Sequence, residues 1–324
     1  MNARKHPVTT VRPVTGRPAT VRPARADEIP ALTTIPDDSE RNASTAGYLE
    51  LLLAKECTRP EWCLVADTED GLIGNVVLWA MPGRDIPADI VLLDAPDDAT
   101  GEALLAAAAA LARDLGATEQ GHVLDTPGQA PQFQRNAEFR EQLLARAGFS
   151  LIRDGRRFIW RAGTPLPPQD SRLTWRPLSD LGREPFIEVL ADVLDDTADS
   201  ILRDEVAEHG ARGAATLNFD DMAGMDHEPE WYEIGYDADD RPVAISLPAR
   251  NAGSAVIGLV GVASAHRGRG YATAVVARGT HVLADNGATE IRGDCDTANV
   301  GMAKAFERAG FTTFARRKMF HRPL

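Results

Sequence analysis

The sequence predicts an α/β protein with two similar domains, each a mixed, mostly antiparallel sheet flanked by helices. Three observations support this fold class. The 324 residues give room for two domains of about 150 residues each. Short patterns of the first half recur in the second half in the same order. Each half also reads as strand, helices, two or three strands, helix, strand, helix, strand, an order typical of sheets covered by helices.

The repeats mark the two copies and their boundary. The pattern R-A-G-F occurs at 146–149 and 308–311, each time followed by paired arginines. The segment L-A-R-D-L-G-A-T-E at 111–119 resembles L-A-D-N-G-A-T-E at 283–290, and V-R-P resembles W-R-P at the two starts. A Pro-rich stretch lies between the copies and is typical of a linker. We therefore expect a disordered tail at 1–19, domains at 20–161 and 172–324, and a linker at 162–171.

Individual elements follow from local patterns. The first 25 residues are rich in Pro, Thr and Arg and lack the apolar core of a signal peptide, so we expect a flexible tail with the first strand near Thr20. Alternating segments at 63–66 and 73–80 flank a turn and predict a hairpin. Segments 231–236 and 242–247 predict a second one.

Composition excludes several classes of function. The formal net charge is −13, which gives no attraction to nucleic acid or anionic lipid. No apolar run reaches the ~18 residues that a membrane helix needs. The three cysteines show no metal-ligand spacing, and their odd number argues against a disulfide framework. We expect a cytoplasmic protein without a metal.

The most informative segment, V-A-S-A-H-R-G-R-G-Y-A-T, occupies 262–273. It follows an apolar strand pattern and opens a helix pattern at 272–283. A strand, a Gly-rich turn and a helix place free backbone N–H groups at a positive helix end, where a pyrophosphate binds well. Gly268 and Gly270 let the main chain approach such a ligand closely, and Arg267 and Arg269 add positive charge.

The chain that follows extends this pattern. Asn286-Gly287 ends the helix, and 291–296 alternates like a strand. A second helix then starts at Asn299 and ends at Gly310-Phe311. Arg267-x-x-Gly270-x-Ala272, Asn299 and Gly310-Phe311 together resemble the signature of the GNAT superfamily of acyl-CoA N-acyltransferases. The resemblance covers the chain from Arg172 to its end, and the tandem layout is similar to that of double-domain members.

The resemblance implies a donor site for acetyl-CoA or another acyl-CoA. The backbone of 260–262 would pair with the pantetheine arm, and the N–H groups of 268–273 would hold the pyrophosphate. Asn299 would contact pantetheine or cap its helix. The implied donor site consists of Val260, Val262, Arg267, Gly268, Arg269, Gly270, Tyr271, Ala272, Thr273, Asn299 and Phe306. The corresponding turn of the first half, 95–101, carries two carboxylates and no arginine, so we expect that half to be degenerate.

The acid–base groups are less well defined by sequence. The strand ending at Val262 has no carboxylate where many family members have Glu, so the candidate bases are Glu233, Asp294 and Asp296, with a chain of waters as the alternative. Asp296 has an alternative role as a helix cap. Phe306 stands where the family usually has Tyr as the acid. Possible replacements are Tyr271, Tyr232 and Tyr236, or no acid, since a thiol has a pKa of only about 8.5. Cys295 is interpreted as a buried apolar residue.

Three hypotheses for function remain at this stage. The leading one is an N-acyltransferase that transfers an acyl group from CoA to a small-molecule amine by direct attack. Acidic residues at 192–225 lie where the family builds its acceptor site and could attract a cationic amine, or form a solvated helix face. A second hypothesis takes the acyl group from an acyl carrier protein's phosphopantetheine, which the arginine-glycine turn disfavours. A third is a CoA-binding sensor without turnover.

Overall fold

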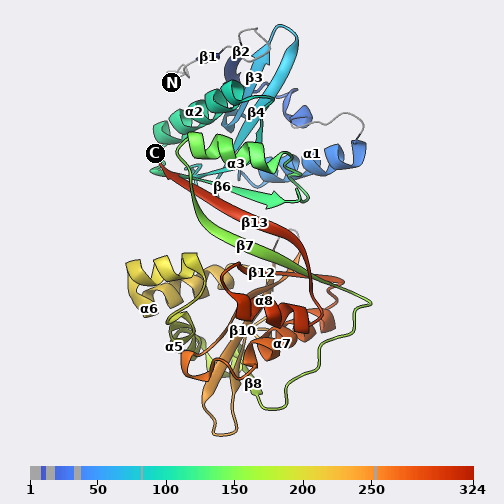
Figure 1. Ribbon diagram of the computed structural model, residues 1–324, viewed down its shortest axis with the longest axis vertical. Coiled ribbons are helices and arrows are strands. Elements are labelled where there is room, and N and C mark those ends of the chain that lie inside the picture. Colours follow the sequence, from blue (N-terminus) through green and yellow to red (C-terminus); the bar gives the residue numbers. More distant parts are fainter. Residues whose placement is uncertain (1–8, 12–18, 33–37, 82, 252–253) are drawn as a thin grey trace. The chain divides into compact units, whose positions relative to one another are not determined.

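The computed structural model describes residues 9–11, 19–32, 38–81, 83–251 and 254–324. The chain divides into two compact units, which Figure 1 shows coloured along the sequence. Unit 1 comprises Met1–Ile152 and Arg317–Leu324, and unit 2 comprises Arg153–Arg316. Each unit is a sheet with helices packed against it, as the sequence predicts.

Unit 1 carries its strands in the order β1-β2-β3-β4-β5-β6-β13. Neighbours from β1 to β5 are antiparallel, whereas β5 and β6 are parallel. Helix α2 packs on β3 and β4, and α3 packs against α2. The elements are β1 (Thr9–Val11), β2 (Ala19–Pro23), η1 (Ile29–Ala31), α1 (Ser39–Ala54), η2 (Pro60–Trp62), β3 (Cys63–Thr68), β4 (Gly71–Trp79), β5 (Asp89–Asp94), α2 (Asp98–Asp114), β6 (Glu119–Thr126) and α3 (Ala137–Arg146).

Unit 2 carries the order β13-β7-β12-β11-β10-β9-β8. Here β11 and β12 form the parallel pair, and β8 to β11 are antiparallel. The elements are β7 (Ser150–Arg161), β8 (Thr174–Pro177), α4 (Leu178–Leu181), α5 (Arg183–Leu194), α6 (Ser200–Ala223), β9 (Glu233–Tyr236), β10 (Pro242–Arg250), β11 (Ala255–Val262), η3 (Ser264–His266), α7 (Tyr271–Asp285), β12 (Glu290–Asp296), α8 (Val300–Arg308) and β13 (Thr312–Pro323). A non-helical Gly210 (φ 71°) divides α6.

The compact units differ from the expected sequence halves at their last strands. Most of β7, which ends the first half, lies in unit 2 and pairs there with β12, from Gly155 against Asp296 to Arg161 against Glu290. The end of β13, which closes the second half, lies in unit 1 instead. The expected linker at 162–171 follows β7 within unit 2. The local sequence pattern predicts that these strands form, but it does not show which sheet each strand joins.

Other sequence predictions can be compared element by element. Both predicted hairpins form, β3 with β4 and β9 with β10. Within the tail expected to be disordered, Thr9–Val11 forms a strand that pairs with β2. The rest of that tail, 1–8 and 12–18, lies outside the described residues. No helix of the described chain is long and apolar enough to cross a membrane.

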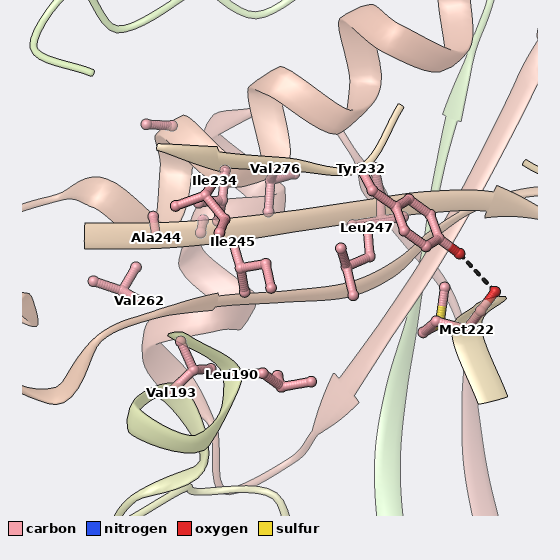
Figure 2. Close-up of a cluster of buried hydrophobic side chains, with 14 of the residues drawn as sticks. Leu190, Val193, Met222, Tyr232, Ile234, Ala244, Ile245, Leu247, Val262 and Val276 are labelled. Atoms are coloured by element: carbon pink, nitrogen blue, oxygen red, sulfur yellow. Dashed lines mark hydrogen bonds between the residues drawn. The ribbon is translucent and has the colours of Figure 1, made fainter. Parts of the chain in front are cut away.

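The core of unit 2 positions the strands that carry the site. Figure 2 shows β10 side chains between Val276 of α7 on one side and Leu190 and Val193 of α5 on the other. Tyr232, which is fully buried, donates its hydroxyl proton to the backbone oxygen of Met222 at 2.6 Å (Figure 2). This packing fixes β10, and β10 in turn holds β11 over nearly its whole length.

Candidate functional site

The parallel strands β11 and β12 separate soon after they meet. They pair only where Ala255–Val256 faces Ile291–Arg292, although β11 continues to Val262. A register shift in β11, at Gly258 (φ 65°), accompanies the divergence. The position requires glycine, because a Cβ there would lie 2.2 Å from the backbone oxygen of Leu247. The end of β11 therefore presents an edge to an opening that β12 leaves free.

The Gly-rich turn lies at the end of this opening. Gly268 and Gly270 both adopt positive φ angles, 77° and 86°, which side chains rarely tolerate. Gly270 is the N-cap residue of α7, and no side chain caps the first turn of that helix. The first N–H groups of a helix have no intrahelical acceptor and carry partial positive charge, so this end is suited to an anion.

A cavity of about 350 Å³ joins the β11 edge, the α7 turn and the start of α8. Most of the donor-site residues that the resemblance implies line it. These are Val260, Val262, Arg267, Gly268, Gly270, Tyr271, Ala272, Thr273 and Asn299. Arg269 and Phe306 are not among its lining residues.

Arg267 anchors the loop that closes one side of the cavity. Its guanidinium donates to the backbone oxygens of Val193 (2.8 Å), Asp195 (2.7 Å) and Asp196 (3.0 Å), at the C-terminal end of α5. These carbonyl groups lie at the negative end of α5, where a cation is favourable. Much of the hydrogen-bonding capacity of Arg267 is thus used to hold 193–198 against the turn.

A second arginine supports the turn from outside. Arg172 donates to the backbone oxygen of Arg269 at 3.0 Å, and its guanidinium lies 4.6 Å from the centre of the Tyr271 ring. Asp170 accepts a 2.9 Å bond from Arg172 and raises the pKa of that guanidinium. The side chain of Arg269 points back to the oxygen of Ala265. Arg269 therefore contributes its backbone to the turn.

Helix α8 forms a further part of the cavity wall. The Asn299 side chain accepts a 3.1 Å bond from the N–H of Met302, which confirms the predicted cap. Arg308, in the last turn of the same helix, lines the cavity and forms no ion pair within the described part of the chain. Arg308 therefore leaves positive charge available at the cavity wall.

The three predicted catalytic carboxylates lie outside the cavity lining. Glu233 is 4% exposed and forms a two-bond ion pair with Arg278, with 2.7 Å between Nη2 and Oε1. Asp294 accepts a 2.7 Å bond from Arg153. Asp296 accepts from the Ser200 hydroxyl (2.8 Å) and the Ala298 N–H (2.8 Å), whereas the cap of α8 is Asn299 and not Asp296.

Phe306, which the resemblance placed in the donor site, lies instead in the core. It is 1% exposed, stacks on Phe158 with ring centres 4.8 Å apart, and meets Phe311 edge-on. Gly293 of β12 makes this possible, because a Cβ there would lie 2.6 Å from the Phe306 ring. Phe306 thus fills space behind the cavity wall.

The other candidate proton donors differ in whether they line the cavity. Tyr271 lines the cavity, whereas Tyr232 is buried and bonded to Met222, and burial raises its pKa. The ring of Tyr236 lies under the Arg176 guanidinium, 4.2 Å from its centre. Burial also raises the pKa of the Cys295 thiol to about 11, which keeps that thiol protonated.

Sequence reasoning missed several residues of the cavity. The missed residues are Val193, Thr197, Ala198, Gly301, Met302, Ala305 and Arg308. Those of α8 recur at helical spacing, at 301, 305 and 308, so the face containing them could have been inferred. Those at 193–198 come from a loop whose position depends on Arg267, a long-range contact. Within the described residues, no group of three or more His, Cys, Asp or Glu side chains could hold a metal ion.

Comparisons with known proteins agree with this geometry. Residues 197–311 match the model of the acetyltransferase (GNAT) family. A GCN5-related N-acetyltransferase from Sphaerobacter thermophilus has 16% identity, a TM-score of 0.60, and coverage of 94% of this chain and 95% of that one. A GCN5-related glucosamine N-acetyltransferase region of a fungal multi-domain β-N-acetylglucosaminidase has 16% identity and a TM-score of 0.51, covering 99% of this chain and 39% of that one. No curated protein matches the chain.

The family match contains the end of β11, the α7 turn and the start of α8, so it covers most of the cavity wall. The structural likeness extends over nearly the whole chain and includes unit 1. At this level of identity it concerns the fold. Residues 197–311 belong to the acetyltransferase (GNAT) family, within a chain that has the fold of such enzymes along nearly its whole length.

Proposed function

We propose that the protein is an N-acyltransferase that takes an acyl group, acetyl above all, from CoA and transfers it to the amine of a small molecule. The observation that carries this proposal is the cavity at the end of β11, where an unpaired strand edge meets an open helix end. Neither feature alone would define a ligand. Together they suit a molecule with an amide-bearing arm at one end and a pyrophosphate at the other.

The donor would occupy this cavity as follows. The amides of the pantetheine arm would pair with the backbone of Val260 and Val262, like an added strand. The pyrophosphate would accept bonds from the N–H groups of 268–273, at the positive end of α7. Arg308 would supply a further charge for the nucleotide end of the donor.

A direct attack by the amine fits the site better than a covalent enzyme intermediate. Cys295 is the cysteine of unit 2, and its buried thiol has a pKa of about 11 and donates to the backbone oxygen of Asn299. The thiolate that would act as nucleophile is therefore scarce near neutral pH. The amine would attack the thioester carbonyl, form a tetrahedral intermediate and expel CoA as thiol or thiolate.

Proton transfers would rely little on carboxylates. Glu233 and Asp294 are held by arginines and Asp296 by hydroxyl and backbone donors, so none of the three faces the cavity. We propose that water removes the amine proton. Among the described residues, Tyr271 is the tyrosine that lines the cavity, which makes it the side chain to protonate the leaving thiolate.

Titration calorimetry with acetyl-CoA tests the donor site. One site per chain is expected. Gly270→Glu should abolish binding, because its carboxylate would occupy the anion site. Gly287→Glu is the matched control, since Gly287 also has a positive φ (83°) and open space but follows the far end of α7. Two equivalent sites per chain, or equal affinities for both variants, would refute the donor assignment.

A non-catalytic sensor is the second candidate. It is favoured by one observation, that none of the three predicted carboxylates is among the residues that line the cavity. An amine screen with acetyl-CoA, scored by released thiol, separates the two. Sustained thiol release with any amine removes the sensor. Binding of CoA without release across a broad screen would favour it. Transfer from an acylated carrier protein, and not from acetyl-CoA, would instead identify the carrier-dependent alternative.

A further inference from the structure

Both arginines of the Gly-rich turn use their side chains on backbone oxygens. The Arg267 guanidinium bonds the C-terminal end of α5, and the Arg269 side chain donates to the oxygen of Ala265. A third arginine, Arg172, contacts the turn from a position 97 residues earlier in the chain, just before β8. Arg172 is not part of the sequence signature, yet its hydrogen bond determines how one peptide group of the turn is oriented.

That peptide group joins Arg269 to Gly270. Nη1 of Arg172 donates to the Arg269 oxygen at 3.0 Å, and the peptide bond is trans. In a trans peptide the C=O of one residue and the N–H of the next point in opposite directions. The N–H of Gly270 therefore points away from Arg172. Gly270 lines the donor cavity, and its N–H has no hydrogen-bond partner within the described part of the chain.

Glycine makes this orientation easy to lose. Rotation of the whole peptide group changes the φ angle of Gly270, and glycine tolerates φ of either sign. A rotated peptide would direct the Arg269 oxygen, instead of an N–H group, towards an anion and would repel it. Arg172 opposes the rotation, because the rotated carbonyl would lose a charged hydrogen-bond donor.

Arg172 is itself held from two sides. Asp170 accepts from its Nε at 2.9 Å and from its backbone N–H at 3.0 Å, and the guanidinium lies 4.6 Å from the centre of the Tyr271 ring. The preceding residues lie along α7, where Nε2 of His281 donates to the oxygen of Pro167 at 2.8 Å. The end of the linker thus docks on α7 and brings the guanidinium to the start of that helix.

The first half of the chain has no counterpart of this arginine. When the repeated R-P pairs are aligned, Arg22 corresponds to Arg176, whereas Pro18 corresponds to Arg172. The first half also has no arginine-glycine turn at 95–101. Arg176 is thus common to both halves, and Arg172 occurs only in the half that has the turn.

We propose that Arg172 is a positioning residue of the donor site, which orients the Arg269–Gly270 peptide so that the Gly270 N–H donates to the pyrophosphate of the donor. The inference rests on the proposed CoA-dependent function. Arg172 is not among the residues that line the cavity, so it acts through the turn and not as a direct phosphate ligand. Its effect is to preorganise the N–H group before the donor arrives.

Calorimetry with acetyl-CoA on the full chain compares Arg172→Ala with Arg176→Ala. Arg176 is the matched control, because its guanidinium also lies over a tyrosine ring, 4.2 Å from the centre of Tyr236, and also pairs with an aspartate, Asp240. Arg172→Ala should weaken acetyl-CoA binding about tenfold or more, because the peptide is then free to rotate. Arg176→Ala should stay within about twofold of the parent. Arg172→Lys should restore affinity to within about threefold, since an ammonium group can also donate to the carbonyl.

A donor without a pyrophosphate separates positioning of the turn from a general change of the cavity. S-acetylpantetheine has the thioester and the arm but no nucleotide, so its affinity should be the same in Arg172→Ala and the parent. Circular dichroism checks that each variant is folded.

The outcomes distinguish this inference from the proposed function. Unchanged acetyl-CoA affinity in Arg172→Ala, with a parent that binds, would overturn this inference alone. An equal loss for S-acetylpantetheine, or no recovery in Arg172→Lys, would also overturn it by showing that the pyrophosphate turn is not what changes. A parent that fails to bind acetyl-CoA would overturn the proposed function and this inference with it.

Discussion

The two units handle the same structural opening in different ways. In each unit, two parallel strands pair over two residue pairs and then separate. The last paired residues are Ile90 of β5 with His122 of β6, and Val256 of β11 with Arg292 of β12. In unit 2 the separation adjoins the cavity. In unit 1 the side chain of Arg140 from α3 enters instead. It donates to the Leu93 backbone oxygen of β5 and, at 3.0 Å, to Asp94.

The residue that makes this difference is identifiable. Relative to the R-A-G-F repeats at 146–149 and 308–311, Arg140 of unit 1 corresponds to Met302 of unit 2. Met302 lines the cavity, whereas Arg140 is 5% exposed and satisfies the β5 edge from within the protein. One side chain of the helix thus replaces the partner that a donor molecule would provide for the strand edge.

The N-terminal ends of the corresponding helices, α7 in unit 2 and α2 in unit 1, also differ in whether a ligand could bind there. The α7 end in unit 2 is uncapped by side chains, whereas α2 in unit 1 is capped by Asp97, whose carboxylate accepts a 2.9 Å bond from the Thr100 N–H. Asp98 adds a second carboxylate in that first turn. A pyrophosphate would meet negative charge there, as expected for a degenerate copy. Both units therefore form the same gap between separating parallel strands, and a few side chains determine whether that gap is open to a ligand.

The largest expected effect comes from placing an arginine in unit 2 at the position that corresponds to Arg140 of unit 1. Met302→Arg should reduce acetyl-CoA affinity by about 100-fold or more, because a guanidinium would fill the opening and bond the β11 edge. Lys304→Arg, on the same helix but not in the cavity lining, is the control. Calorimetry measures both. Normal affinity in Met302→Arg would mean that the opening is not the donor site. The reciprocal Arg140→Met should create no donor site in unit 1, since Asp97 and Asp98 remain.

The next effect concerns the Phe306 side chain that packs behind the cavity wall. Phe306→Ala should lower the free energy of unfolding by about 3–5 kcal/mol through the cavity it leaves against Phe158 and Phe311. Denaturant unfolding measures this loss, and Phe306→Leu should cost less. Acetyl-CoA affinity of the folded variant should change little. A complete loss of donor binding in a folded Phe306→Leu protein would show that Phe306 is part of the donor site.

A smaller effect distinguishes the units by pH. The repeats align buried His122 of β6 with Gly293 of β12. Burial lowers the pKa of His122 to about 4, and its Nδ1 donates to the Ile90 oxygen at 2.8 Å. Since the folded pKa lies below the unfolded value of about 6.5, stability falls as the pH drops from 6.5 towards 4, by about 2 kcal/mol between pH 7 and 5. His122→Gln should remove this part of the pH dependence in denaturant titrations, and an unchanged slope would show that other groups cause it.

The smallest effect sharpens the account of proton transfer. Asp294→Asn should leave kcat within about threefold of the parent, because Arg153 holds this carboxylate and water is proposed as the base. Released thiol measures the rate once an accepted amine is known. Although burial opposes it, the carboxylates of Asp294 and Asp199 raise the pKa of Arg153, so Asp294 serves the charge balance of that arginine. A hundredfold loss of kcat with donor affinity retained would instead identify Asp294 as the base.

Sequence alone predicted the local features well and the long-range ones poorly. The turn with Gly268 and Gly270, the Asn299 cap and both hairpins depend on nearest-neighbour preferences, and each is present. The placement of Phe306 in the core depends on Gly293 and Phe158, which are distant in sequence. The partners of Glu233 and Asp294 are likewise distant arginines, which a pattern of alternating residues cannot reveal.

The location of 317–324 in unit 1 has a consequence for biosynthesis. These residues are translated after unit 2, yet Arg322 becomes buried against Gln120 and the backbone oxygens of Leu105 and Ala147, and Arg317 forms a two-bond ion pair with Asp125. Unit 1, although most of it is synthesised before unit 2, therefore cannot complete its sheet until residues 317–324 have left the ribosome. The edge of β6 stays without this part of β13 until then, and a deletion of residues 317–324 would damage unit 1, although most of unit 1 precedes unit 2 in the chain.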